Sequence, residues 1–144
     1  MLYTEYLKKM YQCPFCYLEK QEIIKENKNA ILTIARAPYT KDHLLVIPKK
    51  HKIKLNSLSK KEKENIEGLI YYGMKKLHKY YKNVTILYRE GNKKEVAKSV
   101  DHLHYHLIPD IKIGSKDKNC KNRKIFSKEE SILTVNELKK RFRD

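Results

Sequence analysis

Three histidines occupy alternate positions, 102, 104 and 106, within the segment VDHLHYHLIPD, residues 100–110. His102, His104 and His106 are half of the six histidines in this 144-residue chain. In a β-strand, side chains two residues apart share a face, so the pattern predicts a row of imidazoles on one side. The residues expected on the opposite, packed side are Leu103, Tyr105 and Leu107. An imidazole row can bind a metal, move protons or attack an electrophile near neutral pH.

Strand geometry limits how many of these histidines can bind one metal ion. Same-face neighbours on a strand lie about 6.6 Å apart. Two nitrogens bound to one zinc ion, each at about 2.0–2.1 Å, must lie within roughly 3–4 Å of each other. At most one or two of the three histidines can therefore serve a single ion, and the rest are available for chemistry.

The cysteines suggest a second chemical feature. Cys13, Cys16 and Cys120 are too few and too unevenly spaced for a disulfide framework. The close pair in CPFC, residues 13–16, therefore needs another explanation.

Three segments, in this order, resemble conserved blocks of the histidine triad (HIT) superfamily of nucleotide hydrolases and transferases. HLHYHLI (102–108) matches the family signature His-φ-His-φ-His-φ-φ, in which φ is apolar. APYTKDHLLVIPKKHK (37–52) resembles the second block, and CPFC resembles the common start of the zinc-containing branch. The resemblance covers most of residues 13–110 and none of the tail.

The resemblance implies a covalent mechanism. His104 would attack the α-phosphorus of a nucleoside phosphate ester, anhydride or phosphoramidate, and water would hydrolyse the nucleotidyl-histidine intermediate. A backbone carbonyl is expected to orient the second ring nitrogen of this nucleophile. His106 would bind a nonbridging phosphate oxygen, and His43 matches a further active-site histidine. Ser99 matches a position near the phosphate or the leaving group.

Several positions depart from the family pattern. Lys98 stands where a glutamine is common, and Arg89 replaces an Asn or Gln. Ala35 stands where the family places a residue that accepts hydrogen bonds from the ribose. Added cations and a lost acceptor favour phosphate-rich or polynucleotide ligands. Two alternatives to nucleotide hydrolysis follow: removal of nucleotidyl groups from nucleic-acid ends, and a nucleotide-binding module with little turnover.

The resemblance also implies a structural Zn²⁺ site and a homodimer. The zinc ligands would be Cys13, Cys16, His51 and His102. Four protein ligands close a tetrahedral site and leave no position for a catalytic water.

Apolar periodicity predicts the elements that position these residues. Strands are expected at 22–27, 30–36, 42–48, 84–90 and 99–109, and a long helix at 59–82 begins with the capping box Ser59–Glu62. A second box, Thr134–Glu137, predicts a short C-terminal helix. The expected fold is α+β, with an antiparallel sheet of about five strands, one long helix and a short last helix. We expect one domain, in which a HIT domain (1–110) carries a basic C-terminal extension (111–144) that begins with an exposed connection (110–128).

The basic composition gives weaker information. The net charge is +16, but only five of the 33 basic residues are arginine. Because phosphate recognition favours the arginine fork, we prefer a solvated basic surface to nucleic-acid binding, which stays a second interpretation. The absence of an apolar run of about 20 residues, or of a signal-peptide centre, predicts a cytoplasmic protein without membrane contact.

Overall fold

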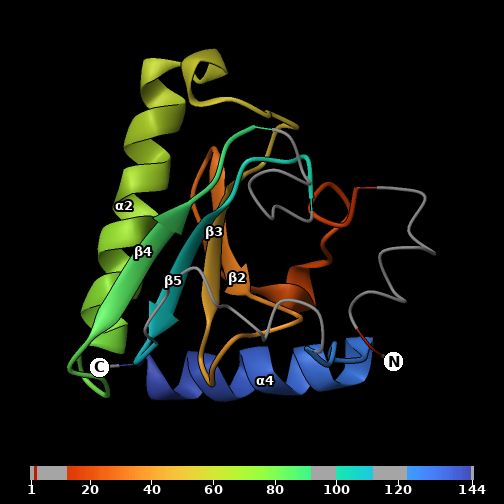
Figure 1. Cartoon of the computed structure of the whole chain (residues 1–144), viewed down its shortest axis with the longest axis vertical. Coiled ribbons are helices and arrows are strands. Elements are labelled where there is room, and N and C mark those ends of the chain that lie inside the picture. The colour runs from red at the N-terminus through yellow and green to blue at the C-terminus, as the bar shows by residue number, and fades with distance from the viewer. Residues whose placement is uncertain (1, 3–12, 92–99, 112–122, 144) are drawn as a thin grey trace.

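The computed structural model of the chain describes Leu2 and residues 13–91, 100–111 and 123–143. Within these ranges the chain forms one five-stranded sheet with the order β1-β2-β3-β5-β4, in which every neighbouring pair is antiparallel. The strands are β1 (Ile23–Glu26), β2 (Ala30–Ile34), β3 (Leu44–Pro48), β4 (Val84–Tyr88) and β5 (Tyr105–Pro109). The helices are η1 (Lys20–Glu22), η2 (Leu55–Ser57), α2 (Lys60–Leu77) and α4 (Lys128–Arg141). The expected α+β fold is confirmed (Figure 1).

Helix α2 covers one face of the sheet and packs against β2, β3 and β5. Its start is as predicted, because Ser59 and Glu62 exchange backbone-to-side-chain hydrogen bonds in a capping box. Its end is earlier than predicted, at Leu77 instead of Lys82. The NH groups of Tyr80 and Tyr81 both donate to the carbonyl of Leu77, so the last turn tightens and closes the helix there.

Helix α4 runs across one end of the sheet, crossing the direction of α2 (Figure 1), and contacts η1, β1 and β2. Its capping box, at Ser127, lies about two helical turns before the predicted one at Thr134. Ser127 and Glu130 form the box, whereas Thr134 lies inside the helix and its hydroxyl donates to the carbonyl of Glu130. The Thr134–Glu137 prediction was wrong because two separate segments, 127–130 and 134–137, fit the same Ser/Thr-x-x-Glu pattern.

The two faces of the sheet differ in what they bury. The face beneath α2 holds the larger core, which includes Leu32, Leu44, Val46 and Leu107, all fully buried. The opposite face carries a smaller apolar cluster of Ile31, Ala35, Leu45 and Ile47, against which Phe15, Leu18 and Ile23 pack. Leu45 pairs directly with His106 across β3 and β5, so this second face also carries the histidines.

None of the helices in the described ranges combines the length and the apolarity needed to cross a bilayer.

Candidate active site and metal centre

The histidine segment joins the sheet later than predicted. Strand β5 begins at Tyr105, so His106 lies on the strand, while His102 and His104 lie in the irregular segment before it, which bends at residues 101–102. The NH of Leu103 donates to the carbonyl of Lys52, 2.7 Å away, instead of entering the sheet ladder. The alternation nevertheless holds: Leu103 packs in the core with Leu107, and all three histidines are buried on the other side.

Hydrogen bonds fix the proton positions on His43 and His106. The NH of Tyr39 donates to Nδ1 of His43 at 3.2 Å, so the proton of a neutral His43 sits on Nε2. His43 Nε2 then donates to Nδ1 of His106 at 2.8 Å. His106 must therefore carry its own proton on Nε2, and it offers an NH donor at its far ring nitrogen.

Burial keeps both of these histidines neutral. Burial, reinforced by the charges of Arg123, His104 and Arg89, lowers the pKa of His43 to about 3. The pKa of His106 lies well below its ordinary value, again because of burial first and of the surrounding positive groups second. The relay from Tyr39 to His106 therefore keeps one proton arrangement across the physiological range.

His104 has the opposite arrangement. Its Nδ1 lies 2.8 Å from the carbonyl oxygen of His102 and donates to it, so the lone pair is on Nε2. The ring centroid of His104 lies 4.8 Å from that of His106. A ring with a free Nε2 lone pair and a ring with an Nε2–H donor are thus neighbours. The expectation that a backbone carbonyl orients His104 is confirmed.

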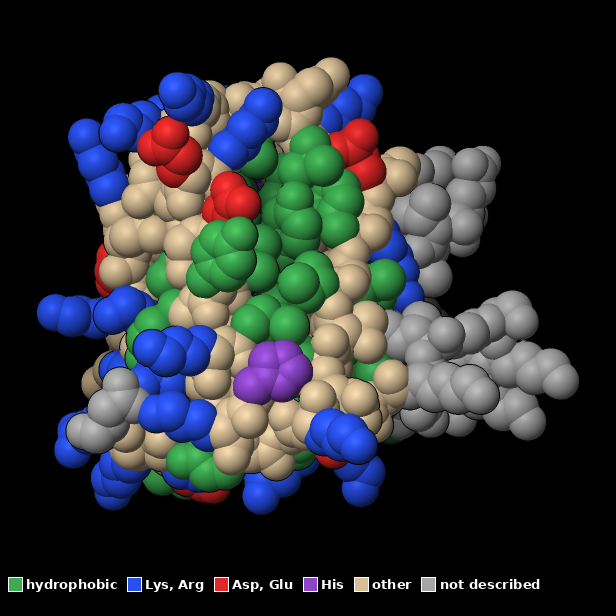
Figure 2. Space-filling view, turned by 90° about the vertical axis from the view of Figure 1, so that its left-hand side faces the viewer, with side chains coloured by type: hydrophobic (Ala, Val, Ile, Leu, Met, Phe, Trp, Pro, Cys, Tyr) green, Lys and Arg blue, Asp and Glu red, His purple; other side chains and the backbone are tan. Residues whose placement is uncertain are grey.

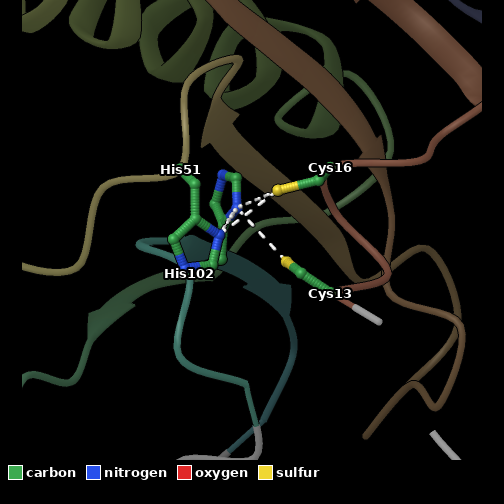
Figure 3. A group of neighbouring side chains, drawn as sticks. All are labelled: Cys13, Cys16, His51 and His102. Carbon is green, nitrogen blue, oxygen red and sulfur yellow. Dashed lines mark hydrogen bonds between the residues drawn. The ribbon is translucent and has the colours of Figure 1, made fainter. Parts of the chain in front are cut away.

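The predicted metal ligands come together. The ligand atoms of Cys13, Cys16, His51 and His102 all lie within 4.8 Å of one another. Figure 3 shows both sulfurs pointing toward the two imidazoles. The two Nδ1 atoms are 3.2 Å apart. Three sulfur–nitrogen pairs, Cys13–His102, Cys16–His51 and Cys16–His102, are separated by 3.2–3.5 Å.

These separations suit a tetrahedral zinc ion. Zinc–nitrogen bonds of about 2.0–2.1 Å and zinc–sulfur bonds of about 2.3 Å require ligand separations of roughly 3.3–3.8 Å. His102 Nε2 donates to the carbonyl of Pro48 at 2.8 Å, which leaves the lone pair of Nδ1 facing the cysteines. The donor set and the tautomer of His102 therefore both fit zinc.

The Phe15 ring lies between this group of four ligands and His104. Phe15 lies between the two cysteines in sequence, and its ring meets His102 edge-on at a centroid distance of 5.7 Å. The same ring contacts His104 at 5.2 Å. A metal that fixes Cys13 and Cys16 would thereby fix the wall beside His104.

Of the three predicted phosphate-binding residues, only Arg89 is among the described residues. Ser99 and Lys98 lie outside the described residues. Arg89 directly follows β4, and its guanidinium lies 3.4 Å from the hydroxyl of Tyr39. Ala35 is buried in the apolar cluster, and Arg36 donates to the carbonyl of Phe126 at 2.8 Å.

Sequence reasoning missed two neighbours of the triad, Tyr39 and Arg123. The ring of Tyr39 stacks on His43 at 5.4 Å, and the guanidinium carbon of Arg123 lies 4.0 Å from the centre of the Tyr39 ring. Arg123 belongs to the segment predicted as an exposed connection, which is wrong for Arg123 and Phe126, because both are half-buried and bond to the turn before His43. The tail lacks a motif that could have signalled this contact.

An antiparallel sheet with three buried, alternating histidines at its fifth strand is typical of a histidine-triad protein. The chain belongs to the HIT family, since the HIT domain family model matches residues 19–113. An adenosine 5′-monophosphoramidase of Schizosaccharomyces pombe is 33% identical over 103 residues, which cover 67% of this chain and 73% of the relative.

Two solved structures share the fold. A diadenosine triphosphate hydrolase of Plasmodium falciparum, solved with cyclomarin A, is 27% identical with a TM-score of 0.65, and the match covers 85% of this chain and 77% of that one. A zinc-bound histidine triad family protein of Mycobacterium smegmatis is 22% identical with a TM-score of 0.63, and the match covers 90% and 94% of the two chains.

Proposed function

We propose that this protein is a nucleotide hydrolase or nucleotidyl transferase that acts at the α-phosphorus of a nucleoside phosphate ester, anhydride or phosphoramidate. The observation that carries this proposal is the pair of neighbouring rings of His104 and His106, of which the first has its lone pair on Nε2 and the second its NH on Nε2. The names of the relatives, a monophosphoramidase and a diadenosine triphosphate hydrolase, support the same class of reaction.

The reaction proceeds in two displacements. Nε2 of His104 forms a bond to the α-phosphorus, and the bond from phosphorus to the leaving oxygen or nitrogen breaks, with its electron pair moving to the leaving group. The positive charge on the His104 ring is stabilised by the carbonyl of His102, which accepts the Nδ1 proton. His106 donates to a nonbridging oxygen, where negative charge gathers in the transition state.

Water then attacks the phosphorus of the nucleotidyl-histidine. The phosphorus–nitrogen bond breaks, its electrons return to Nε2 of His104, and the water loses a proton to solvent. The products are a nucleoside monophosphate and the free enzyme. His43 takes no covalent part and positions His106 through the hydrogen bond at 2.8 Å.

The nucleoside is expected beside Phe15, on the face of the sheet that carries the histidines. Ile31, Leu45 and Ile47 are buried on this face, and Phe15 and Leu18 pack against them. Phe15 is only half-buried and also touches His104, so a base that lies against its ring has its phosphate close to His104. Ala35 offers no polar side chain to ribose hydroxyls.

Zinc is the cofactor that the Cys13, Cys16, His51 and His102 group is suited to hold. The ion would have a structural role. It would join the segment of Cys13 and Cys16 to the residues before β5, and protein ligands would occupy all four of its coordination positions. The existence of a zinc-bound relative supports this assignment.

A homodimer is also part of the proposal. Among the described strands, β4 pairs with β5 alone and so offers one unpaired edge. Ile86 on this strand is 47% exposed, and Tyr71 on α2 is 69% exposed. The side of the molecule that carries α2 and β4 has a continuous area of apolar side chains ringed by charged ones (Figure 2). An unpaired edge beside exposed apolar residues favours association with a second copy.

Covalent labelling tests the enzymatic proposal. The protein is incubated with α-labelled adenosine nucleotides, quenched in denaturant at neutral to alkaline pH, and examined for acid-labile label. We expect label on the wild type and none on His104→Ala, with His78→Ala, an exposed histidine, as the matched control. Complete absence of label and of turnover with every nucleotide would leave the nucleotide-binding module as the function.

A further inference from the structure

The turn between β2 and β3, which leads into His43, is held by the C-terminal segment. Arg123 Nη1 donates to the carbonyl of Ala37 at 2.5 Å. Three residues later, Phe126 and Arg36 exchange two hydrogen bonds: the Phe126 NH donates to the Arg36 carbonyl, and the Arg36 side chain donates to the Phe126 carbonyl, each at 2.8 Å. Arg123 is therefore fixed beside the active site by its own hydrogen bond and by those of Phe126.

Tyr39 places two guanidinium groups next to the triad. Its ring stacks on His43 and lies 6.5 Å from the ring of His106. Arg123 lies over the same ring at 4.0 Å, and Arg89 reaches the hydroxyl at 3.4 Å. One aromatic side chain thus brings a cation from the C-terminal segment and a cation from the end of β4 to one place.

The charges around this place are positive. Arg89 and Arg123 both act on His43 and His106 and disfavour their protonation. Two acidic residues lie near these groups in sequence, and both have partners. Asp42, beside His43, is bound by both terminal nitrogens of Arg141 and by the hydroxyl of Tyr81. Glu90, beside Arg89, accepts hydrogen bonds from the NH of Leu55 and the hydroxyl of Tyr88. The electrostatic field beside His106 is therefore suited to an anion.

We propose that Arg123, Arg89 and Tyr39 form a second anion subsite, which binds the phosphate of the leaving group and makes the enzyme selective for substrates whose leaving group carries one. This inference rests on the proposed function. In that reaction the leaving oxygen departs in line with attack, on the side of the phosphorus away from His104. The ring contacts run from His104 to His106, then to His43 and Tyr39, and end at Arg123, so the subsite lies past the phosphate donor.

The subsite acts on one step only. When the bond between phosphorus and the bridging oxygen breaks, the departing phosphate gains negative charge, which the two guanidiniums stabilise. An amine released from a phosphoramidate has no phosphate to bind there. Substrates with and without a leaving phosphate should thus respond differently to loss of Arg123.

The test compares three substrates with the purified full chain. Adenosine 5′-phosphoramidate has no leaving phosphate, whereas diadenosine triphosphate and a 5′-adenylated oligonucleotide each have one. For Arg123→Gln we expect kcat/KM to fall about 10- to 100-fold on at least one phosphate-bearing substrate and to change less than about threefold on the phosphoramidate. The phosphate-bearing substrate that suffers the larger fall identifies the source, a nucleotide or a nucleic-acid end.

The controls separate the subsite from the reaction itself. Arg143→Gln removes an exposed arginine of the same extension and should leave all three substrates unchanged. Arg123→Lys keeps the charge and should recover part of the loss. Equal effects of Arg123→Gln on all three substrates, or no effect on any of them, would overturn the subsite. Failure of the wild type on every substrate would instead overturn the proposed function.

Discussion

Arg141, the last residue of α4, forms two hydrogen bonds of 2.9 and 2.6 Å with the carboxylate of Asp42, the residue directly before His43. Asp42 has a φ of 65°, in the left-handed region that only glycine, asparagine and aspartate adopt at low cost. Burial alone would raise the pKa of this carboxyl, but the hydrogen bonds from Arg141 and Tyr81 and the charges of Arg141 and Lys41 bring it below its usual value. The C-terminal helix therefore holds the turn that delivers His43.

The energy of this pair can be measured with a double-mutant cycle. Asp42→Asn keeps the tolerance for positive φ, and Arg141→Gln keeps hydrogen-bonding capacity, so the two changes remove charge with little else. We expect a coupling free energy of about 1–3 kcal/mol from urea unfolding. Glu137→Gln is the control, since this exposed carboxylate lies 3.8 Å from Arg141 and should contribute under about 0.5 kcal/mol. If the effects of Asp42→Asn and Arg141→Gln on the free energy of unfolding are additive, the ion pair contributes nothing to stability.

The zinc proposal predicts metal loss when one ligand is replaced. Protein purified without added zinc should contain about one ion per chain, and Cys16→Ser should contain nearly none and unfold at a lower temperature, because metal binding stabilises only the folded site. His78→Ala, which removes an exposed histidine outside the group, should keep its zinc. Elemental analysis and thermal unfolding provide the two measurements.

Cobalt substitution distinguishes a structural from a catalytic metal. Four protein ligands that include two thiolates should give Co²⁺ the visible absorption of a tetrahedral thiolate site. The cobalt protein should label His104 as fast as the zinc protein, because no substrate atom contacts the ion. A labelling rate that changes more than about threefold with the metal would contradict a purely structural role.

Stability should fall as the pH falls below about 6.5. The pKa of His43 is about 3 in the folded protein and near 6.5 in an unfolded chain. Between these values the unfolded state binds a proton that the folded state excludes, so the free energy of unfolding decreases as the pH drops, by up to about 1.4 kcal/mol per pH unit for this histidine. His106 acts in the same direction.

A non-titrating variant isolates the contribution of His43. His43→Gln can still donate to His106 but cannot gain a proton, so its free energy of unfolding should change less between about pH 7 and pH 5 than that of the wild type. The other histidines are the same in both proteins, so their effects cancel in the comparison. His78→Gln should follow the wild-type pH dependence. An identical slope in His43→Gln would mean that His43 is not held neutral.

The sequence predicted those parts of the site whose residues sit in short motifs. Cys13 and Cys16 meet His51 and His102 because each belongs to a recognisable block, and the alternation of residues 102–107 correctly separated core from site. Arg123 and Ala37 are 86 positions apart, and Arg141 and Asp42 are 99 apart. Such contacts depend on where α4 docks, and local patterns carry no information about docking.

Ambiguity between equivalent local signals explains the remaining errors. Helical periodicity alone could not end α2 at Leu77, because Tyr81 continues the same spacing but turns to donate to Asp42. Strand alternation likewise could not locate the start of β5, because the alternation of buried faces continues through residues 102–104, which lie outside the sheet ladder.

The dimer proposal predicts a change of association state from a single substitution at the sheet edge. Ile86→Lys places a charge on the exposed face of β4, where a second copy would pair, and it should convert a dimer to a monomer in light-scattering measurements. Leu133→Lys changes a residue that is 69% exposed on α4, away from this edge, and should leave the association state unchanged. A wild type that is monomeric at high micromolar concentration would contradict the proposal.

Two glycines of α2 offer an internal comparison of packing. A methyl group added at Gly73 would lie 2.6 Å from Cδ1 of the fully buried Leu107 and 3.6 Å from Cδ1 of Leu32, so α2 can approach the sheet closely only without a side chain there. Gly73→Ala should lower the free energy of unfolding by about 1–3 kcal/mol, because the core must shift to admit it. Gly68 has no neighbour within 4 Å of the same added atom, so Gly68→Ala should raise stability by about 0.5–1 kcal/mol through helix propensity alone. Because both changes are identical and sit in one helix, urea unfolding of the two variants isolates the packing constraint. Equal changes of the same sign in the free energy of unfolding would show that the close contact between Gly73 and Leu107 does not constrain the packing of α2.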